Sequence, residues 1–190
     1  MQQLKRSRYP LRDSDVRKLL DAADLLRDRV IINFLALCGL RRAETAQAEC
    51  KDIDWKNGRL MVLGKRDRER LVPVPGSALQ DLKFYLHKRR TGFIFPSRRS
   101  DAKQPHIGVE QINEIVKRAG WHANLINPNP NLKNINPHSL RHYYAHKLKK
   151  SGVRIETISY LLGHADIKTT LAEYGNQSIE EMQAEIAKVW

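Results

Sequence analysis

NPHSLRHYYAHKL, residues 136–148, is the stretch on which the fold assignment depends. Asn136 is a good N-cap residue, and Pro137 fits the first helical position because its missing N–H is not needed there. His138 and Arg141 follow three positions apart, so we expect them to share a face of the first helical turn. Free N–H groups and the helix dipole favour an anion at this end. A lone pair of this kind is more often a solvated basic face.

The second informative stretch is YLLGHADIKTTLAEYG, residues 160–175. Gly163 closes a short apolar helical pattern, which places His164 at a helix terminus. Tyr174 follows ten residues later. Tyrosine can act as a covalent nucleophile where neighbouring charges stabilise its phenolate. Histidines, an arginine and a tyrosine are most of what is needed to hold and break a phosphate diester.

Three further candidates lie in the first half of the chain. Arg41 directly follows the apolar run RVIINFLALCGL (29–40). It is either an exposed loop charge or a guanidinium held at a rigid point, where it can bind a phosphate with two hydrogen bonds. Glu44 lies three residues on, where it can orient Arg41 or face solvent. Lys65 stands at the tip of a predicted hairpin, where lysine usually serves solubility but can also protonate a leaving alkoxide.

Hydrophobic periodicity predicts a mainly α protein with a small three-stranded antiparallel β-sheet, an α+β fold. The turn Asn57-Gly58 and the runs RLMVLG (59–64) and RLVPVP (70–75) indicate the sheet. Asp13 is expected to cap the first helix. Helices are predicted over about 14–26, 29–40, 42–49, 78–90, 108–121, 137–150, 154–163 and 178–190.

The composition favours a polyanionic partner, because 34 Lys and Arg face 21 Asp and Glu for a net charge of +13. A soluble protein that is merely basic is the plainer alternative. Binding to a membrane surface is a weaker one, because the charge is spread along the chain. No apolar run is long enough to span a membrane, and residues 1–15 do not form a signal peptide. Cys38 and Cys50 lack metal or disulfide spacing and fit a reducing compartment.

No single motif is specific, but their order is. The chain resembles the catalytic domain of the tyrosine recombinases, the phage-integrase and Xer-like family, over about residues 9–176. The matching motifs are an arginine turn (Arg41, Glu44), a lysine hairpin (Lys65, Arg70, Val72, Pro73), H-x-L-R-H (His138, Leu140, Arg141, His142) and LLGH followed by TT (Leu161 to His164, Thr169, Thr170).

Two features depart from that pattern. Family members commonly place the nucleophile nine residues after the LGH histidine, but here that residue is Glu173 and Tyr174 is the tenth. We expect the loop to absorb the extra residue. Many relatives also carry an N-terminal DNA-clamping domain, so this chain is either a minimal protein or an excised domain. The resemblance divides it into a basic tail (1–10), a catalytic domain (11–177) and a C-terminal helix (178–190) that docks on a neighbouring protomer or packs on its own domain.

The resemblance implies DNA strand cleavage and rejoining through a 3′-phosphotyrosyl intermediate. Tyr174 would attack the scissile phosphate, and a free 5′-hydroxyl would be left for a later strand to reverse the attack. Arg41 and Arg141 would hold the two non-bridging oxygens, where preorganised donors are most useful in the transition state.

The remaining roles also come from the resemblance. Lys65 would protonate the leaving 5′-oxygen, His138 would accept or orient the tyrosine proton, and His164 would hydrogen-bond a phosphate oxygen. No metal and no cofactor are expected. The implied partners are double-stranded DNA and further copies of the chain, from a dimer to a tetrameric synapse, in the cytoplasm and associated with DNA.

Two alternatives remain at this point. A type IB topoisomerase-like enzyme uses the same residue types to relax DNA, although LLGH and GLRRAE favour the recombinase. A relative that has lost activity and merely binds DNA is the second, and the displaced Tyr174 is the feature that supports it.

Overall fold

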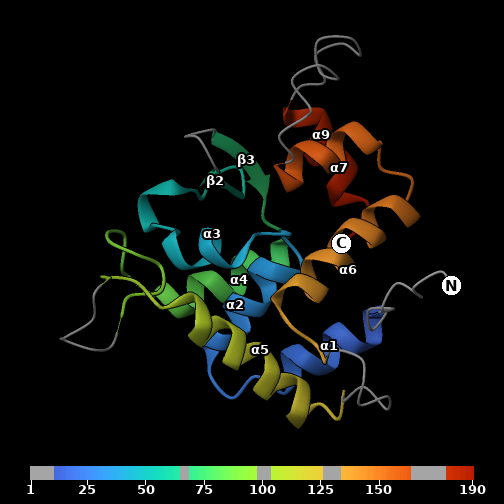
Figure 1. The fold of residues 1–190 in the computed structure, drawn as a ribbon. Coiled ribbons are helices and arrows are strands. Elements are labelled where there is room, and N and C mark those ends of the chain that lie inside the picture. The colour runs from blue at the N-terminus through green and yellow to red at the C-terminus, as the bar shows by residue number, and fades with distance from the viewer. Residues whose placement is uncertain (1–10, 65–68, 98–103, 126–133, 164–178) are drawn as a thin grey trace, which may run out of the picture.

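The computed structural model describes residues 11–64, 69–97, 104–125, 134–163 and 179–190. It confirms a mainly helical protein with one three-stranded antiparallel sheet (Figure 1). Within these ranges no helix is both long and apolar enough to cross a bilayer. The elements are α1 (Asp13–Asp21), α2 (Leu26–Ala36), α3 (Arg42–Gln47), η1 (Cys50–Asp52), β1 (Ile53–Asp54), β2 (Arg59–Leu63), β3 (Glu69–Pro73), α4 (Gly76–Leu86), α5 (Val109–His122), α6 (Pro137–Lys150), α7 (Ile155–Leu162) and α9 (Ile179–Ala187).

Helix α2 is the buried central helix that the apolar run predicted. Every residue from Val30 to Ala36 is buried, and the helix packs against α1, α3, α4, α5 and α6. It ends at Ala36, earlier than predicted, and the chain then turns at Gly39 with φ of 66°. The ring of Tyr144 occupies the space that a side chain at Gly39 would need, so this turn requires glycine.

The prediction for the first helix is wrong in two details. Asp13 is its first residue rather than its cap, and the helix ends at Asp21 instead of reaching Leu26. Arg12 occupies the N-cap position, where its backbone N–H donates to Asp15 at 2.8 Å. The Asp13 carboxylate instead accepts hydrogen bonds from Oη of Tyr143 (2.8 Å) and Nζ of Lys147 (3.0 Å), so it joins α1 to α6.

The sheet places one charged side chain among apolar ones. Its order is β1-β2-β3, and the β2–β3 pairing runs from Arg59 opposite Pro73 to Leu63 opposite Glu69. Alternate residues of β3 face inward, so Arg70 shares the buried face with Val72 and pairs with the buried Val62. A buried arginine on the inner face of a strand needs partners from elsewhere in the fold.

Helix α6 begins as the sequence predicts and connects two parts of the core. The Asn136 side chain accepts from the N–H groups of His138 (3.0 Å) and Ser139 (3.2 Å), and Pro137 is the first helical residue. Tyr143 belongs to the main core built around α2. Tyr144 belongs to a second apolar cluster that α6 forms with α7 and α9.

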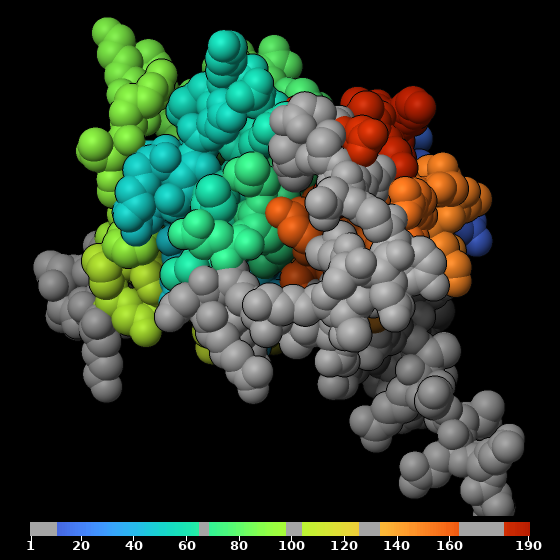
Figure 2. All heavy atoms as spheres, turned by 90° about the horizontal axis from the view of Figure 1, so that it is seen from above, coloured from blue at the N-terminus to red at the C-terminus, as the bar shows by residue number. Residues whose placement is uncertain are grey.

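Helix α9 covers this second cluster within its own chain. Met182 and Ile186 are buried, and the Trp190 ring is stacked on Tyr144 with ring centroids 6.4 Å apart. Gln183 adds a polar link to the sheet, where its Oε1 accepts from Nε of Arg59 at 2.6 Å. In Figure 2 the red atoms of α9 lie beside the orange atoms of α6 and α7, as the ribbon in Figure 1 also shows. Docking of residues 178–190 on a neighbouring protomer stays a prediction.

Candidate active site

The centre of the site is the carboxylate of Glu44, which the start of α3 holds in place. Arg41 is the N-cap of this helix and Glu44 its third residue. The backbone N–H of Arg41 donates to Oε2 of Glu44 at 2.7 Å, while Nη1 of Arg41 donates to Oε1 at 2.7 Å. The spacing R-x-x-E lets the Glu44 carboxylate accept from both the N-cap backbone N–H and the guanidinium of Arg41, so local backbone geometry fixes both side chains.

Arg70 is the second partner of this carboxylate, a residue that the sequence matches to the lysine-hairpin motif without giving it a role in the site. Its Nη1 and Nη2 donate to the two oxygens of Glu44 at 3.0 and 2.8 Å. It is 5% exposed. The sequence did carry a signal, since a charged residue at an inward position of a predicted strand calls for a buried partner.

Arg141 completes the group from α6. Its Nη1 lies 3.9 Å from Oε2 of Glu44, and its terminal nitrogens donate to the carbonyl oxygens of Gly39 and Leu162. The residue is 8% exposed, so the alternative that Arg141 belongs to a solvated basic face is wrong. Burial and the neighbouring charge of Arg41 lower the pKa of Arg141 to about 10, which leaves it protonated at neutral pH.

The charges of this group determine how Glu44 titrates. Burial by itself raises the pKa of a carboxylate, but the hydrogen bonds and charge of Arg70, together with the two hydrogen bonds from Arg41, outweigh it. They hold the pKa of Glu44 at about 2. Glu44 is therefore ionised at neutral pH, and three guanidinium groups surround one negative charge.

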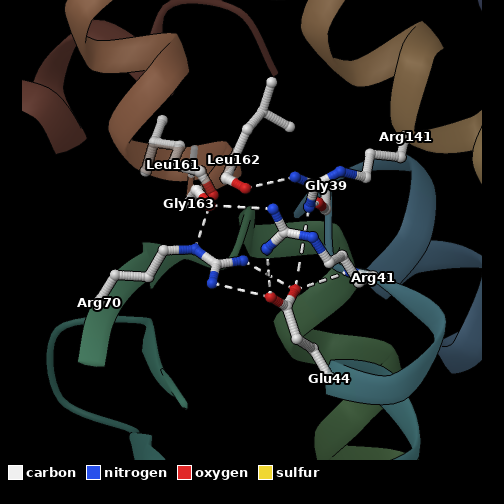
Figure 3. A network of polar contacts seen from close by, with 8 residues as sticks. All are labelled: Gly39, Arg41, Glu44, Arg70, Arg141, Leu161, Leu162 and Gly163. Atoms are coloured by element: carbon white, nitrogen blue, oxygen red, sulfur yellow. Dashed lines mark hydrogen bonds and ion pairs between the residues drawn. The ribbon is translucent and has the colours of Figure 1, made fainter. Parts of the chain in front are cut away.

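The C-terminal end of α7 anchors all three arginines, as the dashed lines in Figure 3 show. Carbonyl groups at the end of a helix lack partners within the helix and carry the negative end of its dipole, so they suit cations. Three consecutive carbonyl oxygens accept from three different arginines: Leu161 from Nε of Arg70 (2.9 Å), Leu162 from Nη2 of Arg141 and Gly163 from Nη2 of Arg41 (2.9 Å).

Gly163 allows this close approach. Its φ is 58°, in the left-handed region, and an added Cβ would lie 2.9 Å from Nη1 of Arg70 and 3.2 Å from Nη1 of Arg41. The next residue in the chain is His164. The LLG part of the LLGH motif thus orders guanidinium groups through its backbone, a role that side-chain patterns do not reveal.

His138 lies at the exposed start of α6. Its Nε2 is 3.0 Å from Nε2 of His142, one turn on, and the ring centroids are 4.3 Å apart. A hydrogen bond between two imidazole nitrogens needs one donor and one acceptor, so one of these nitrogens is unprotonated while the bond exists. His138 and Arg141 thus have different surroundings: His138 is exposed to solvent, whereas the side chain of Arg141 is buried in the protein.

Three predicted site residues, Lys65, His164 and Tyr174, lie outside the described residues. Among the described tyrosines, Tyr143 and Tyr144 are unsuited to nucleophilic attack, because burial raises the pKa of both phenols. Tyr160 accepts a hydrogen bond from the N–H of Leu71 at 3.3 Å and so helps to join α7 to β3.

Comparison with known proteins shows the family to which this chain belongs. The model of the phage integrase family matches residues 10–181. The chain belongs to the phage integrase family. Tyrosine recombinase XerA of Pyrococcus horikoshii is 31% identical over 163 residues, and XerD of Pseudomonas aeruginosa is 33% identical over 169 residues. Each alignment covers 84% of this chain but only 54% and 55% of the relative, so this family member spans about half the length of these curated relatives.

Solved structures show that the fold is shared within the family. The integrase from mycobacterium phage Brujita has a TM-score of 0.78 at 22% identity, covering 99% of this chain and 60% of that one. A crystal structure of XerA recombinase has a TM-score of 0.73 at 22% identity, covering 99% and 66%. The family resemblance and the fold inferred from the sequence motifs are thereby confirmed.

Proposed function

We propose that this chain carries the strand-cleavage site of a site-specific DNA recombinase that works through a 3′-phosphotyrosyl intermediate. The observation that supports this most directly is the charge imbalance around Glu44. Arg41, Arg70 and Arg141 contribute three positive charges to a half-buried site, and Glu44 is the carboxylate that the described residues place against them. Excess positive charge in a poorly solvated place is costly unless the site serves an anion.

The partly exposed member of the group is suited to that anion. Arg41 is the most exposed of the three side chains at 35%, against 10% for Arg141 and 4% for Arg70. Arg141 uses two of the five donors of a guanidinium on carbonyl oxygens, so others remain for a phosphate oxygen. We assign Arg41 and Arg141 to the two non-bridging oxygens of the scissile phosphate, where charge increases in the transition state.

The proposed reaction exchanges one phosphodiester for another. The Tyr174 phenolate oxygen forms a bond to phosphorus as the bond to the 5′-oxygen breaks, so no external energy source is needed. His138 takes the phenol proton, Lys65 gives a proton to the leaving 5′-oxygen, and His164 donates a hydrogen bond to a phosphate oxygen. A 5′-hydroxyl from a second strand then reverses the step. The relatives bear recombinase names, which favours this reading over a topoisomerase-like one.

We further propose that the protein acts on double-stranded DNA in the cytoplasm as an oligomer, from a dimer to a tetrameric synapse. The net charge of +13 supports a polyanionic partner. Residues 178–190 would dock on a neighbouring protomer in that assembly. The surface formed by Tyr144, Leu148 and Leu161 now receives α9 of the same chain. An identical copy offers the same surface, so an exchange of α9 between protomers would preserve these contacts.

The test is a trapping experiment on DNA that the protein itself selects. Duplexes enriched for binding from a random pool are rebuilt with single nicks placed at successive positions, so that the short 5′-hydroxyl fragment diffuses away after cleavage. We expect a covalent protein–DNA adduct that survives denaturation, and strand exchange when two intact duplexes are supplied. Tight binding without any adduct would instead support a DNA-binding relative that has lost activity. Relaxation of supercoiled DNA without exchange would support the topoisomerase-like alternative.

A further inference from the structure

Arg70 is nearly inaccessible, yet it bonds both to the Glu44 carboxylate and to the end of α7. Its side chain is 4% exposed and lies on the inner face of β3, among apolar residues such as Val62 and Val72. Such a position excludes direct contact with a DNA phosphate in this arrangement. The charge must therefore act through its neighbours.

Arg70 holds the Glu44 carboxylate with both of its terminal nitrogens. The two parallel hydrogen bonds, 3.0 and 2.8 Å long, fix the plane of the carboxylate, whose terminal torsion is otherwise broad. The same two oxygens accept from the guanidinium and the backbone N–H of Arg41, each at 2.7 Å. A rotation of Glu44 would consequently move Arg41.

The third donor of Arg70 reaches another segment. Its Nε donates to the carbonyl oxygen of Leu161 at 2.9 Å, two residues before the Gly163 carbonyl that accepts from Arg41. One guanidinium thus joins β3, α3 and the end of α7. Figure 3 shows Arg70 and Arg41 approaching Glu44 from different elements, with the end of α7 above them.

A purely structural role does not account for this arrangement well. Replacing a buried ion pair by apolar residues is often neutral or stabilising, so such a pair gives little stability in itself. Here one carboxylate also serves Arg41 and lies 3.9 Å from Arg141, which leaves the group net positive. What the arrangement does provide is a fixed position for the more exposed guanidinium of Arg41.

We propose that Arg70 is a positioning residue for strand cleavage, which sets the place of Arg41 through Glu44 and ties this pair to the end of α7 directly before His164. The proposal rests on the proposed function. It predicts that Arg70 affects the cleavage step and leaves DNA binding almost unchanged, because it does not itself contact DNA.

The experiment compares Arg70→Lys with Arg29→Lys on the nicked duplexes described above. Lysine keeps the charge but cannot form the two parallel bonds. Arg29 is the control, because its guanidinium also bonds to a carboxylate (Nε to Asp81 at 2.8 Å) and to a backbone carbonyl (Nη1 to Leu20 at 3.1 Å), in a different and more exposed part of the fold. We expect Arg70→Lys to bind DNA within about 3-fold of the wild type and to cleave it about 10- to 100-fold more slowly, by analogy with the loss of residues that orient the ligands of metal sites. Arg29→Lys should cleave at the wild-type rate.

Two further measurements define the route. Duplexes with a 5′-bridging phosphorothiolate, whose sulfur leaves without a proton, should not rescue Arg70→Lys, because the defect lies at the phosphate clamp. In a Glu44→Gln background, Arg70→Lys should cause little additional loss, since both changes act on one unit.

Each contrary result overturns a specific claim. A wild-type cleavage rate for Arg70→Lys, rescue by the phosphorothiolate, full additivity with Glu44→Gln, or an equal loss in Arg29→Lys would each reject the positioning role while the wild-type adduct stands. Absence of the adduct in the wild type would reject the proposed function itself, and the role of Arg70 in cleavage with it.

Discussion

Gly163 and Arg70 lie so close together that a Cβ atom added to Gly163 would be 2.9 Å from Nη1 of Arg70. The glycine ends α7 in the left-handed conformation, and its carbonyl oxygen accepts from Arg41. A side chain at this position would therefore act on two guanidinium groups of the site at once.

The first prediction is that Gly163→Ala abolishes cleavage out of proportion to its effect on stability. A left-handed φ costs an L-residue about 1–2 kcal/mol, and the new methyl group would displace Arg70 and Arg41 as well. Gly152→Ala is the matched control, because Gly152 also has a positive φ, of 80°, but no atom lies within 4 Å of its added Cβ. Urea unfolding and adduct formation measure the two effects. Equal loss of cleavage in both variants would contradict the prediction.

The second prediction concerns pH and Glu44. Its pKa is held at about 2, below its ordinary value of 4.5, so the folded state favours the ionised form. Relative to a protonated Glu44, the ionised carboxylate stabilises the folded state by on the order of 3 kcal/mol, an effect that is fully present above about pH 4.5 and is lost as the pH falls toward 2. The difference in unfolding free energy between the wild type and Glu44→Gln should be largest near neutral pH and should narrow between pH 5 and pH 3.

Glu114→Gln provides the control for this titration. Glu114 forms an exposed pair with Lys117 at 2.7 Å, and its side chain is 66% exposed. Surface pairs of this kind contribute little, so its unfolding free energy should follow the wild type at every pH. If the difference in unfolding free energy between the wild type and Glu44→Gln stays constant with pH, the ionised carboxylate is not the source of the stability.

The third prediction concerns the C-terminal helix. Removing residues 178–190 should leave a chain that binds one DNA site but assembles poorly on two. Ile186→Ala should show the same assembly defect. It should also lower the free energy of unfolding by roughly 2–3 kcal/mol, because Ile186 is only 2% exposed and packs in the cluster around Tyr144. Lys188→Ala, at an exposed position near the same end, should do neither. Sedimentation with one-site and two-site duplexes measures how each variant assembles on DNA. If the truncated chain unfolds as a monomer, α9 belongs to the core of its own chain and the docking prediction is wrong.

Local signals in the sequence predicted local structure well. Arg41 was singled out because it directly follows the apolar run, and Glu44 because it lies three residues on, close enough to orient Arg41. The start of α6 was predicted because Asn136 and Pro137 are strong start signals. In these cases the atoms that fix the geometry lie within four residues of each other. The sequence therefore contains the whole interaction.

Long-range partners were not predictable in this way. The partners of Arg70 are a carboxylate 26 residues away and a backbone carbonyl 91 residues away. Asp13 was wrongly expected to cap α1, because Tyr143 and Lys147 approach it from α6, 130 and 134 residues on. The acceptors at the end of α7 are backbone carbonyl groups, which every residue has, so side-chain patterns do not predict them. Tertiary packing decides such contacts, and it overrides local preference.

The fourth prediction concerns Tyr174, the proposed nucleophile. It follows His164 by ten residues where nine is common in the family, and one residue on a helix corresponds to a rotation of about 100°. Three of the described tyrosines are poor substitutes, since Tyr143 and Tyr144 are buried and Tyr160 is hydrogen-bonded to β3. Tyr174→Phe should therefore bind DNA as the wild type does and form no adduct, whereas Tyr160→Phe should keep the adduct. Peptide mapping of the wild-type adduct should place the DNA on the fragment that contains Tyr174. An adduct that persists in Tyr174→Phe, or that maps to another tyrosine, would show that the extra residue has moved the nucleophile elsewhere.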